Sequence, residues 1–467
     1  MNRQGAKVAK IYIYSALLAS WRFIRIPAMR HAILTVDLGF GDAGKGSIVD
    51  FLARTHEAHT VVRYNGGAQA GHRVVTSGPA PREHVFAQFG SGTLAGAATH
   101  LSRFMLLDPL AMVEEEQHLR SLGVAEAFDR TTIDARALVI TPFGRAVNRL
   151  KELARGDGRH GSCGMGVGET AFDALEHGER VLRAGDLADP ETLRAKLRFL
   201  RTINLAKARA LRPAPPENEQ AAREWDMLLD GRAIEWLADA YGGFAEHARI
   251  VPGDELHRIL ERPGTVIFEG AQGVLLDEWH GFHPYTTWST TTPENATLLL
   301  AEAGYGGQVT RLGLTRGYAT RHGPGPLVTE DPELARALPD ARNSFGDWQR
   351  GFRVGWLDLV MLQYALDVAG PLDGLAVTCL DRLASLPELH VCRRYGYSTF
   401  TIERIAPAPA PRDLAYQERI TQSLARCRPL LETVGDPAAL LDLLAAELGV
   451  PIRLISEGPT AVDKHLL

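Results

Sequence analysis

A glycine-rich turn between a short apolar run and a helical pattern constrains the fold of this chain more than any other feature. Residues 32–36 are apolar and partly β-branched, glycine recurs through residues 39–46, and residues 47–53 have the pattern of a helix. A strand, a glycine turn and a helix in this order open a parallel α/β unit. Such a turn can aim backbone N–H groups at an anion beside the positive end of the helix. The sequence therefore predicts a phosphate-binding loop, and a tight turn without a ligand is the alternative.

Further short apolar runs predict the rest of a sheet. They comprise residues 60–64, 265–269, 374–378 and 452–455. Buried strands of a parallel sheet are short and apolar, and ligand sites form at their carboxyl ends. Residues 110–260 are richer in helical patterns, and the proline-rich residues 212–216 and 406–411 predict surface loops. We expect an α/β fold with a mostly parallel central sheet flanked by helices, built as one large domain over residues 29–467 with helical insertions.

Composition narrows the class of protein. The 467 residues carry 51 basic and 56 acidic side chains, a net charge of −5, which argues against a nucleic-acid binder held by a general basic surface. The four cysteines have no paired spacing and predict neither a zinc site nor a disulfide framework, so a cytoplasmic location is expected. No run reaches the roughly 20 apolar residues that a membrane crossing needs.

Residues 1–28 differ from the rest of the chain because they contain basic but no acidic residues. They have the features of a targeting peptide. We favour the alternative that they are a disordered extension or a mis-assigned start, with Met29 as the first residue, because a predicted strand begins directly after Met29.

The phosphate loop contains a carboxylate and a lysine. Lys45 can reach phosphate oxygens, but Gly46 separates it from Ser47, unlike a Walker A loop. Asp42 would repel bound phosphates unless a cation or a reacting proton offset its charge. It is therefore a candidate magnesium ligand, a candidate general base, or both, and a solvated turn residue is the alternative.

Several motifs in order resemble the adenylosuccinate synthetase family. Residues 41–47 are similar to the family's GDEGKGK loop and residues 66–73 to GGHNAGHT. Residues 268–277 match FEGAQGTLLD, residues 321–330 resemble TRVGAGPFPTE, and residues 355–358 match GWLD. Residues 378–381 resemble TKLD and residues 455–459 resemble ISTGP. The order of so many motifs, from about residue 29 to the C-terminus, is far more specific than any one of them.

The resemblance implies a GTP-dependent carbon–nitrogen ligase, using Mg²⁺, that joins IMP and L-aspartate as a homodimer. Phosphorylating the purine 6-oxygen makes it a leaving group that an amine can displace. Asp42 matches the family's base for the N1 proton, His72 matches the histidine that stabilises the transferred phosphoryl group, and Lys45 completes the catalytic set. Asp42 and Gly71 match the magnesium position.

The binding residues also follow from the resemblance. For GTP they are Gly41, Asp42, Ala43, Gly44, Lys45, Gly46, Ser47, Gly71, His72, Arg73, Cys379, Leu380, Asp381, Ser456, Glu457 and Gly458. Asp381 can accept from both N1–H and the 2-amino group of guanine, which adenine lacks. For the nucleotide and the amine they are Gln69, Ser162, Cys163, Gln272, Leu276, Thr287, Arg350 and Arg353. The family's arginine that reaches across a dimer falls near residues 177–180.

The acceptor-amine segment departs most from the family pattern. Family members read approximately FGATTGRRRRTGWLD, whereas residues 345–358 here read FGDWQRGFRVGWLD. Both threonines are gone, Asp347, Trp348 and Phe352 have entered, and the arginines that remain are Arg350 and Arg353. Paired carboxylates favour forked arginine donors and hydroxyls.

Three functions therefore stay open. The first is the ligase with IMP and L-aspartate. The second is a paralogous ligase of a specialised, nucleoside-type pathway, with a different amine or an acyl-phosphate intermediate. The third is a catalytically silent GTP-binding protein, against which the joint presence of Asp42, Lys45 and His72 argues.

Overall fold

The computed structural model describes residues 29–211, 218–340, 342–343, 346 and 348–467. Its centre is a sheet with the strand order β20-β19-β15-β11-β1-β10-β2-β5-β7-β9. The neighbouring strands pair in parallel, except that β20 runs antiparallel to β19. The α/β fold with a mostly parallel sheet is therefore confirmed. The single-domain boundary stays a prediction, and residues 1–28 lie outside the described residues.

The strands of the central sheet include every predicted run. They are β1 (Arg30–Asp37), β2 (Thr60–Arg63), β5 (Ala98–Leu101), β7 (Thr131–Asp134), β9 (Arg249–Val251), β10 (Gly264–Glu269), β11 (Gln308–Arg316), β15 (Gly374–Thr378), β19 (Ile452–Ser456) and β20 (Lys464–Leu466). The predicted helix lies within α2 (Lys45–Thr55), and residues 406–411 form a loop as predicted. The predicted loop at residues 212–216 lies outside the described part of the chain.

Helices cover both faces of the sheet, and the side chains of each strand point alternately to one face and to the other. On one face Ile33 packs with Val49 and Leu52 of α2. On the other face Leu34 packs among residues of α9 (Glu255–Glu261) and α10 (Glu294–Glu302). The central strands can therefore be apolar throughout, and their polar groups gather at the carboxyl ends.

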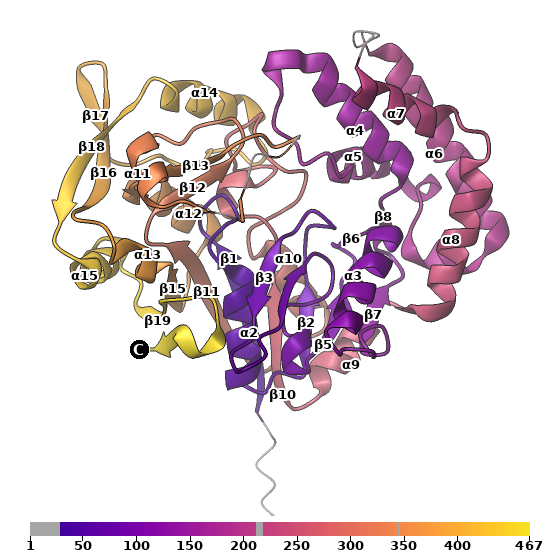
Figure 1. The fold of residues 1–467 in the computed structure, drawn as a ribbon, viewed down its shortest axis with the longest axis horizontal. Helices are drawn as coiled ribbons and strands as arrows, with labels where there is room; N and C mark the ends of the chain where they lie inside the picture. Colours follow the sequence, from indigo (N-terminus) through magenta and orange to yellow (C-terminus); the bar gives the residue numbers. More distant parts are fainter. Residues whose placement is uncertain (1–28, 212–217, 341, 344–345, 347) are drawn as a thin grey trace, which may run out of the picture.

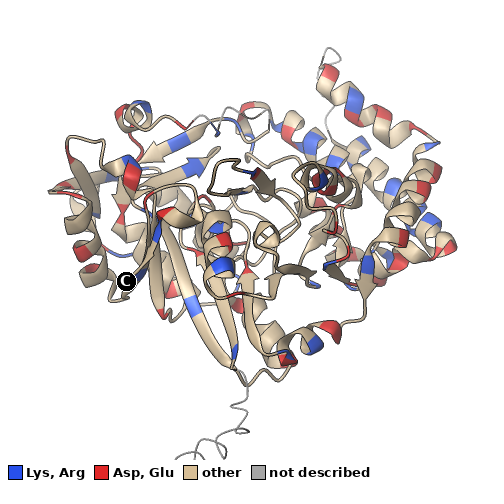
Figure 2. Ribbon diagram, turned by 60° about the horizontal axis from the view of Figure 1, so that its bottom comes forward, with Lys and Arg blue, Asp and Glu red and all other residues tan. Residues whose placement is uncertain are grey.

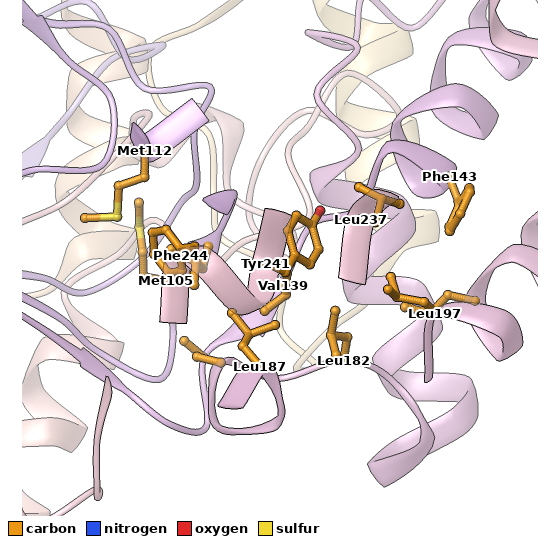
Figure 3. Packing of buried hydrophobic residues seen from close by; sticks show 14 of the residues in the cluster. Met105, Met112, Val139, Phe143, Leu182, Leu187, Leu197, Leu237, Tyr241 and Phe244 are labelled. Carbon is orange, nitrogen blue, oxygen red and sulfur yellow. The ribbon is translucent and has the colours of Figure 1, made fainter. Parts of the chain in front are cut away.

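A helical region covers one side of the molecule (Figure 1, right). It contains α3 (Pro109–Ser121), α4 (Pro142–Arg155), α5 (Val167–His177), α6 (Pro190–Ala210), α7 (Glu219–Leu229) and α8 (Ala233–His247). Figure 3 shows Tyr241 and Phe244 of α8 packed among apolar side chains from several of these elements. Tyr241 also donates a hydrogen bond to the carbonyl of Ile140, 3.2 Å away, so its buried hydroxyl is satisfied. This core holds α4 and α5 in place beside the sheet.

A second region covers the other side (Figure 1, left). It contains the ribbon of β12 (Ala319–His322) and β13 (Phe352–Gly355), the sheet of β14 (Leu357–Asp358), β16 (Leu389–Tyr397), β17 (Phe400–Ile402) and β18 (Arg428–Val434), and the helices α11 (Pro332–Ala337), α12 (Leu359–Ala369), α13 (Leu380–Leu383), α14 (Leu414–Leu424) and α15 (Pro437–Leu448). The hairpin of β3 (His72–Val75) and β4 (Glu83–Phe86) lies against α2, and β6 (Leu106–Leu107) pairs with β8 (Leu138–Val139).

Surface charge is mixed over the described residues. Figure 2 shows Lys and Arg interspersed with Asp and Glu over the helices. All four cysteines are free. None of the helices in the described part of the chain combines the length and apolarity that a membrane crossing requires.

Candidate active site

The phosphate loop is held by a carboxylate at the end of β1. Asp37 accepts hydrogen bonds from the backbone N–H groups of Gly39 (2.8 Å) and Ala43 (2.9 Å) and from Lys45 Nζ (2.8 Å). Lys45 Nζ also donates to the carbonyl of Gly41 at 2.6 Å. Lys45 therefore braces the loop from inside: its ammonium is paired with Asp37, and Lys45 is not among the residues that line the cavity beside the loop. Asp37 was missed in the sequence because it precedes the loop motif.

Close packing explains why the residue between Lys45 and Ser47 is a glycine. A Cβ atom on Gly46 would lie 2.7 Å from the carbonyl carbon of His72 and 2.8 Å from the backbone oxygen of Arg73. Neither backbone atom can move away without displacing β3. The start of α2 and the start of β3 therefore touch, and this contact brings His72 to the phosphate loop.

His72 is oriented by a buried carboxylate. Its Nδ1 atom lies 2.6 Å from Oε1 of Glu269, at the end of β10, and Glu269 also accepts from the N–H (2.9 Å) and the hydroxyl of Ser91. The Glu269 carboxylate is ionised: burial raises its pKa, but Arg63 on the neighbouring strand β2, together with His72 and Ser91, lowers the pKa to about 2. Glu269 belongs to a quoted motif, but the sequence alone did not assign it a role.

Burial decides the resting state of His72. Desolvation lowers the pKa of His72 to about 4, although the neighbouring Glu269 raises it. The imidazole is therefore neutral at pH 7, and we assign its proton to Nδ1, which donates to Glu269. This leaves Nε2 as the edge that can meet a ligand.

A cavity of about 500 Å³ opens beside the phosphate loop. Of the residues predicted from sequence, it is lined by Gly41, Asp42, Gln69, Gly71, His72, Ser162, Cys163, Gln272, Leu276 and Thr287. These residues come from segments more than 200 positions apart, so the fold brings most of the predicted nucleotide positions to one chamber. Its volume lies in the range of small-molecule sites.

Asp42 presents its carboxylate to this cavity. Its Oδ2 atom is buried and has no hydrogen-bond partner among the described residues, and His322 Nε2 lies 3.7 Å from it. Arg316 Nε donates to the backbone oxygen of Asp42 at 2.5 Å and so fixes the backbone behind the carboxylate. Neither Arg316 nor His322 was singled out in the sequence, because both act through positions distant in the chain.

Two glutamine side chains that line the cavity have amide atoms without hydrogen-bond partners among the described residues. Both amide atoms of Gln69 and the Oε1 atom of Gln272 are buried and make no hydrogen bond among the described residues. Gln272 also adopts φ 57°, a left-handed conformation that is uncommon outside glycine. Buried amides without partners are costly unless a ligand satisfies them, so these side chains are candidates for contacts with a polar substrate.

The loop over residues 161–168 forms another wall. Ser162 Oγ donates to Asn148 Oδ1 (3.0 Å) and accepts from Asn148 Nδ2 (2.8 Å). Desolvation raises the pKa of the Cys163 thiol, which is therefore uncharged at pH 7. Lys151 of α4, which also lines the cavity, pairs with Glu169 at 2.6 Å.

The predicted guanine-reading residues lie at the ends of β15 and β19, which are neighbours in the sheet. Cys379 adopts φ 60° and precedes α13, whose first turn carries the exposed Asp381. Thr378 Oγ1 donates to the carbonyl of Ala43 at 3.1 Å, which ties the end of β15 to the phosphate loop. The candidate guanine site and the candidate phosphate site therefore lie next to each other. Ser456 and Gly458 join it from the end of β19, where Ser456 Oγ donates to the Gly458 carbonyl.

The two arginines of the acceptor segment have different surroundings. Arg353 pairs with the carboxylate of Glu330 through two nitrogens and donates to the carbonyls of Gly323 (3.1 Å) and Gly325 (2.8 Å). Arg350 has one long contact, 3.8 Å to Asp157, and its side chain is 40% exposed. Of the two, Arg350 has the guanidinium more open to a ligand. Asp347 lies outside the described residues.

A family model for adenylosuccinate synthetase matches residues 34–464, nearly the whole described chain. The chain belongs to the adenylosuccinate synthetase family. Adenylosuccinate synthetase family members are GTP-dependent ligases, so the protein is a ligase.

Curated adenylosuccinate synthetases agree over most of their length. The protein from Desulfovibrio desulfuricans is 32% identical over 441 residues, which cover 91% of this chain and 97% of the relative. The proteins from Desulfosudis oleivorans (34% over 411 residues, 86% of each chain) and Clostridium beijerinckii (31% over 412 residues, 86% of this chain and 87% of the relative) are similar to the same extent.

Two solved structures share the fold. The fully ligated adenylosuccinate synthetase from Plasmodium falciparum has a TM-score of 0.72 at 20% identity, covering 93% of this chain and 99% of that one. The succinoaminodeoxyadenylate synthetase of cyanophage S-2L, bound to dGMP and dATP as an energy donor, has a TM-score of 0.56 at 17% identity, covering 94% and 95%.

Proposed function

We propose that this adenylosuccinate synthetase family member uses GTP to phosphorylate the 6-oxygen of IMP, or of an IMP-like nucleotide, and then displaces the phosphate with the amine of L-aspartate. The observation that carries the proposal is the meeting of two groups in one cavity. The Asp42 carboxylate and the His72 imidazole both line it, directly beside the phosphate loop. A base for the purine and a partner for the phosphoryl group are thereby within reach of one substrate.

In the first step, Asp42 removes the N1 proton of the purine. The electron pair moves to the 6-oxygen, which attacks the γ-phosphorus, and the bond to the β-phosphate oxygen breaks to release GDP. The backbone N–H groups at the start of α2 stabilise the transferred charge, and the ion pair of Lys45 with Asp37 holds the loop that presents them. Gln69 and Gln272 are placed to hydrogen-bond the nucleotide, since their amide atoms otherwise lack partners.

His72 would change state as the triphosphate arrives. Its imidazole is neutral in the free protein, but a polyanion beside Nε2 favours the protonated form. An imidazolium between Glu269 and the phosphoryl group donates from both nitrogens and offsets the developing negative charge. Glu269 stays ionised and fixes the ring orientation, as a carboxylate partner does for other catalytic histidines.

The donor set fits magnesium. Asp42 offers a carboxylate oxygen without a partner and Gly71 offers a backbone carbonyl at the same cavity, while no group of three or more His, Cys, Asp or Glu side chains among the described residues could hold a metal by itself. Magnesium is usually held by one or two protein oxygens together with phosphates and waters. Asp42 and Gly71 would hold the ion, which neutralises charge on the phosphates.

Guanine preference is assigned to Asp381, together with Cys379, Leu380, Ser456, Glu457 and Gly458 around it. ITP differs from GTP only in lacking the 2-amino group, which would donate a hydrogen bond to the second carboxylate oxygen of Asp381. We expect GTP to be used about 10-fold better than ITP, and Asp381→Asn to remove that difference. Equal use of GTP and ITP by the unaltered protein would contradict this assignment.

A second candidate function differs in the amine. Two features of the acceptor-amine segment favour it. Arg353 is already engaged by Glu330 and two backbone carbonyls, and Phe352 occupies a position that is arginine in the family pattern. A dicarboxylate needs two anion sites, and the described part of this segment offers Arg350 as its most open guanidinium. An amine with fewer carboxylates than aspartate is the alternative acceptor.

One experiment separates these functions. The full-length protein is incubated with GTP, Mg²⁺ and IMP, with and without L-aspartate, while phosphate release and purine absorbance are recorded. Aspartate-dependent turnover supports the first function, and turnover with another amine supports the second. GTP binding without turnover in any mixture would leave a silent GTP-binding protein. Arms with dGMP and dATP are included because the cyanophage neighbour is described with these nucleotides.

We also propose the cytoplasmic location expected from the unpaired cysteines and, from the family resemblance, a homodimer. Sedimentation velocity of the full-length protein would test it. A monomer at all concentrations would contradict it.

A further inference from the structure

A two-stranded ribbon joins the acceptor segment to the cavity wall. Strands β12 and β13 pair antiparallel, and His322 lies directly opposite Phe352. The two rings touch, with centroids 4.9 Å apart and planes inclined by 53°. His322 lines the cavity, so its imidazole has the acceptor segment on one side and the candidate nucleotide site on the other.

The imidazole also faces the candidate base. His322 Nε2 is 3.7 Å from Oδ2 of Asp42, and the side chains are 24% and 21% exposed. A movement of about 0.5 Å would bring this pair to hydrogen-bond distance. The Arg316 guanidinium lies 6.0 Å from the centroid of the Phe352 ring, and its Nε atom donates to the Asp42 backbone oxygen. Phe352 is therefore a neighbour of two side chains that both lie against Asp42.

Both members of the ribbon pair depart from the family pattern. The motif TRVGAGPFPTE has valine where this chain has His322, and the arginine run before TGWLD has arginine where it has Phe352. The two changes face each other across the ribbon, and they are complementary: an aromatic ring packs on an imidazole, whereas a guanidinium there would repel a protonated one. A valine could not reach Asp42 with a polar atom.

We propose that His322 is a positioning residue for Asp42 and that Phe352 holds it in place. The inference rests on the proposed function, in which Asp42 removes the N1 proton. Arg316 holds the Asp42 backbone, but the Oδ2 atom of the carboxylate has no hydrogen-bond partner among the described residues. A donor on Oδ2 limits its rotation before the nucleotide binds. A carboxylate has about four lone-pair sites, so this hydrogen bond leaves room for the N1 proton and a magnesium ion.

The test uses the family's own residue. In His322→Val the first step should slow about 10-fold while KM for GTP and IMP stays within about 2-fold, because the lost contact orients a reacting group rather than a ground-state ligand. His322→Gln, which keeps an N–H donor, should recover most of the rate. His247→Val, on the exposed last turn of α8, is the control for the substitution type and should leave the rate unchanged.

The rate is measured without an amine. Exchange of ¹⁸O from the β,γ-bridge of GTP, in the presence of IMP and Mg²⁺, reports phosphoryl transfer alone. A wild-type protein without IMP-dependent exchange overturns the proposed function, and the inference with it. Wild-type exchange that is unchanged in His322→Val overturns the inference alone. Equal defects in His322→Val and His322→Gln also overturn it, since hydrogen bonding would then be irrelevant.

The role of Phe352 is tested by a double-mutant cycle. Phe352→Arg, which restores the family residue, should slow exchange because it removes the support of the imidazole. If His322 acts through this support, the effects of His322→Val and Phe352→Arg are not additive: the double variant should be no slower than the slower single variant. Additive effects would show that Phe352 does not hold His322.

Discussion

The Nζ atom of Lys45 lies 2.8 Å from Oδ2 of Asp37, and both side chains are almost completely buried. In a Walker A loop the lysine points outward to the phosphates. Here its ammonium closes the loop from within, because Asp37 also holds the N–H groups of Gly39 and Ala43. The pair therefore links the end of β1 to the start of α2 and shapes the anion site.

Replacing Asp37 by Asn should unfold the loop and weaken GTP binding together. The change leaves the Lys45 ammonium buried without a counter-charge, which costs about 3–5 kcal/mol of unfolding free energy. Denaturant unfolding and GTP titration measure the two effects. The control is Asp254→Asn, which removes an exposed ion pair with Arg258 and should change stability by less than about 1 kcal/mol. Equal stability of the two variants would contradict the bracing role.

A methyl group on Gly46 should separate the phosphate loop from β3. Gly46→Ala places Cβ within 3 Å of the backbone at His72 and Arg73, so we expect a loss of about 1–3 kcal/mol of stability and of most GTP affinity. Gly242→Ala on α8 is the matched control, because no atom lies within 4 Å of its added Cβ. That change should be neutral or stabilise by about 1 kcal/mol. Calorimetric melting and GTP titration distinguish the two glycines.

Acid should destabilise the protein first through buried neutral histidines. Burial lowers the pKa of His100 to about 4, as it does for His72. Between pH 6.5 and 4 the unfolded chain takes up a proton at such a group and the folded chain does not. The free energy of unfolding therefore decreases as the pH is lowered through this range. The His100 contribution is about 3 kcal/mol when complete. His100→Gln should flatten the profile of unfolding free energy over this range, whereas the exposed His247→Gln should not.

A second acid phase follows from Glu269. Its folded-state pKa of about 2 lies below the ordinary value of 4.5. Its stabilisation is therefore present above pH 4.5 and is lost between pH 4.5 and 2. Glu269→Gln should remove this second phase and also lower the phosphoryl-transfer rate, because Gln cannot support a protonated His72. Retention of the phase in the variant would assign it to other carboxylates.

Asp42→Asn should abolish phosphoryl transfer and leave the fold intact. An amide cannot take the N1 proton, so we expect a loss of about 10²–10⁴-fold in the rate of GDP formation. The Oδ2 atom of Asp42 has no hydrogen-bond partner among the described residues, so the melting temperature should stay near that of the unaltered protein. Single-turnover GDP formation with IMP and calorimetric melting are the measurements. A fully active Asp42→Asn protein would exclude Asp42 as the base.

Local chain patterns predicted β1, β2, β10, β15 and β19 and the glycine turn before α2, but not β5, β7, β9, β11 or β20. Residues 32–36, 60–64, 265–269, 374–378 and 452–455 are short apolar runs, and all lie on neighbouring or nearby strands of one parallel sheet. Such strands are buried on both faces, so their sequence reports their environment directly. The motif order then assigned the family, which the match over residues 34–464 confirms.

The partners of the candidate site residues could only come from the tertiary structure. Asp37 with Lys45, Glu269 with His72, and His322 with Asp42 are contacts across 8, 197 and 280 positions, and none follows a local pattern. Charge, burial and hydrogen bonding at a site are set by what the folded chain brings within a few ångströms. The sequence by itself thus predicted which groups would carry the chemistry. The packing of α2, β3, β10 and the β12–β13 ribbon decided how each group is oriented, because orientation depends on neighbours that the chain meets only when folded.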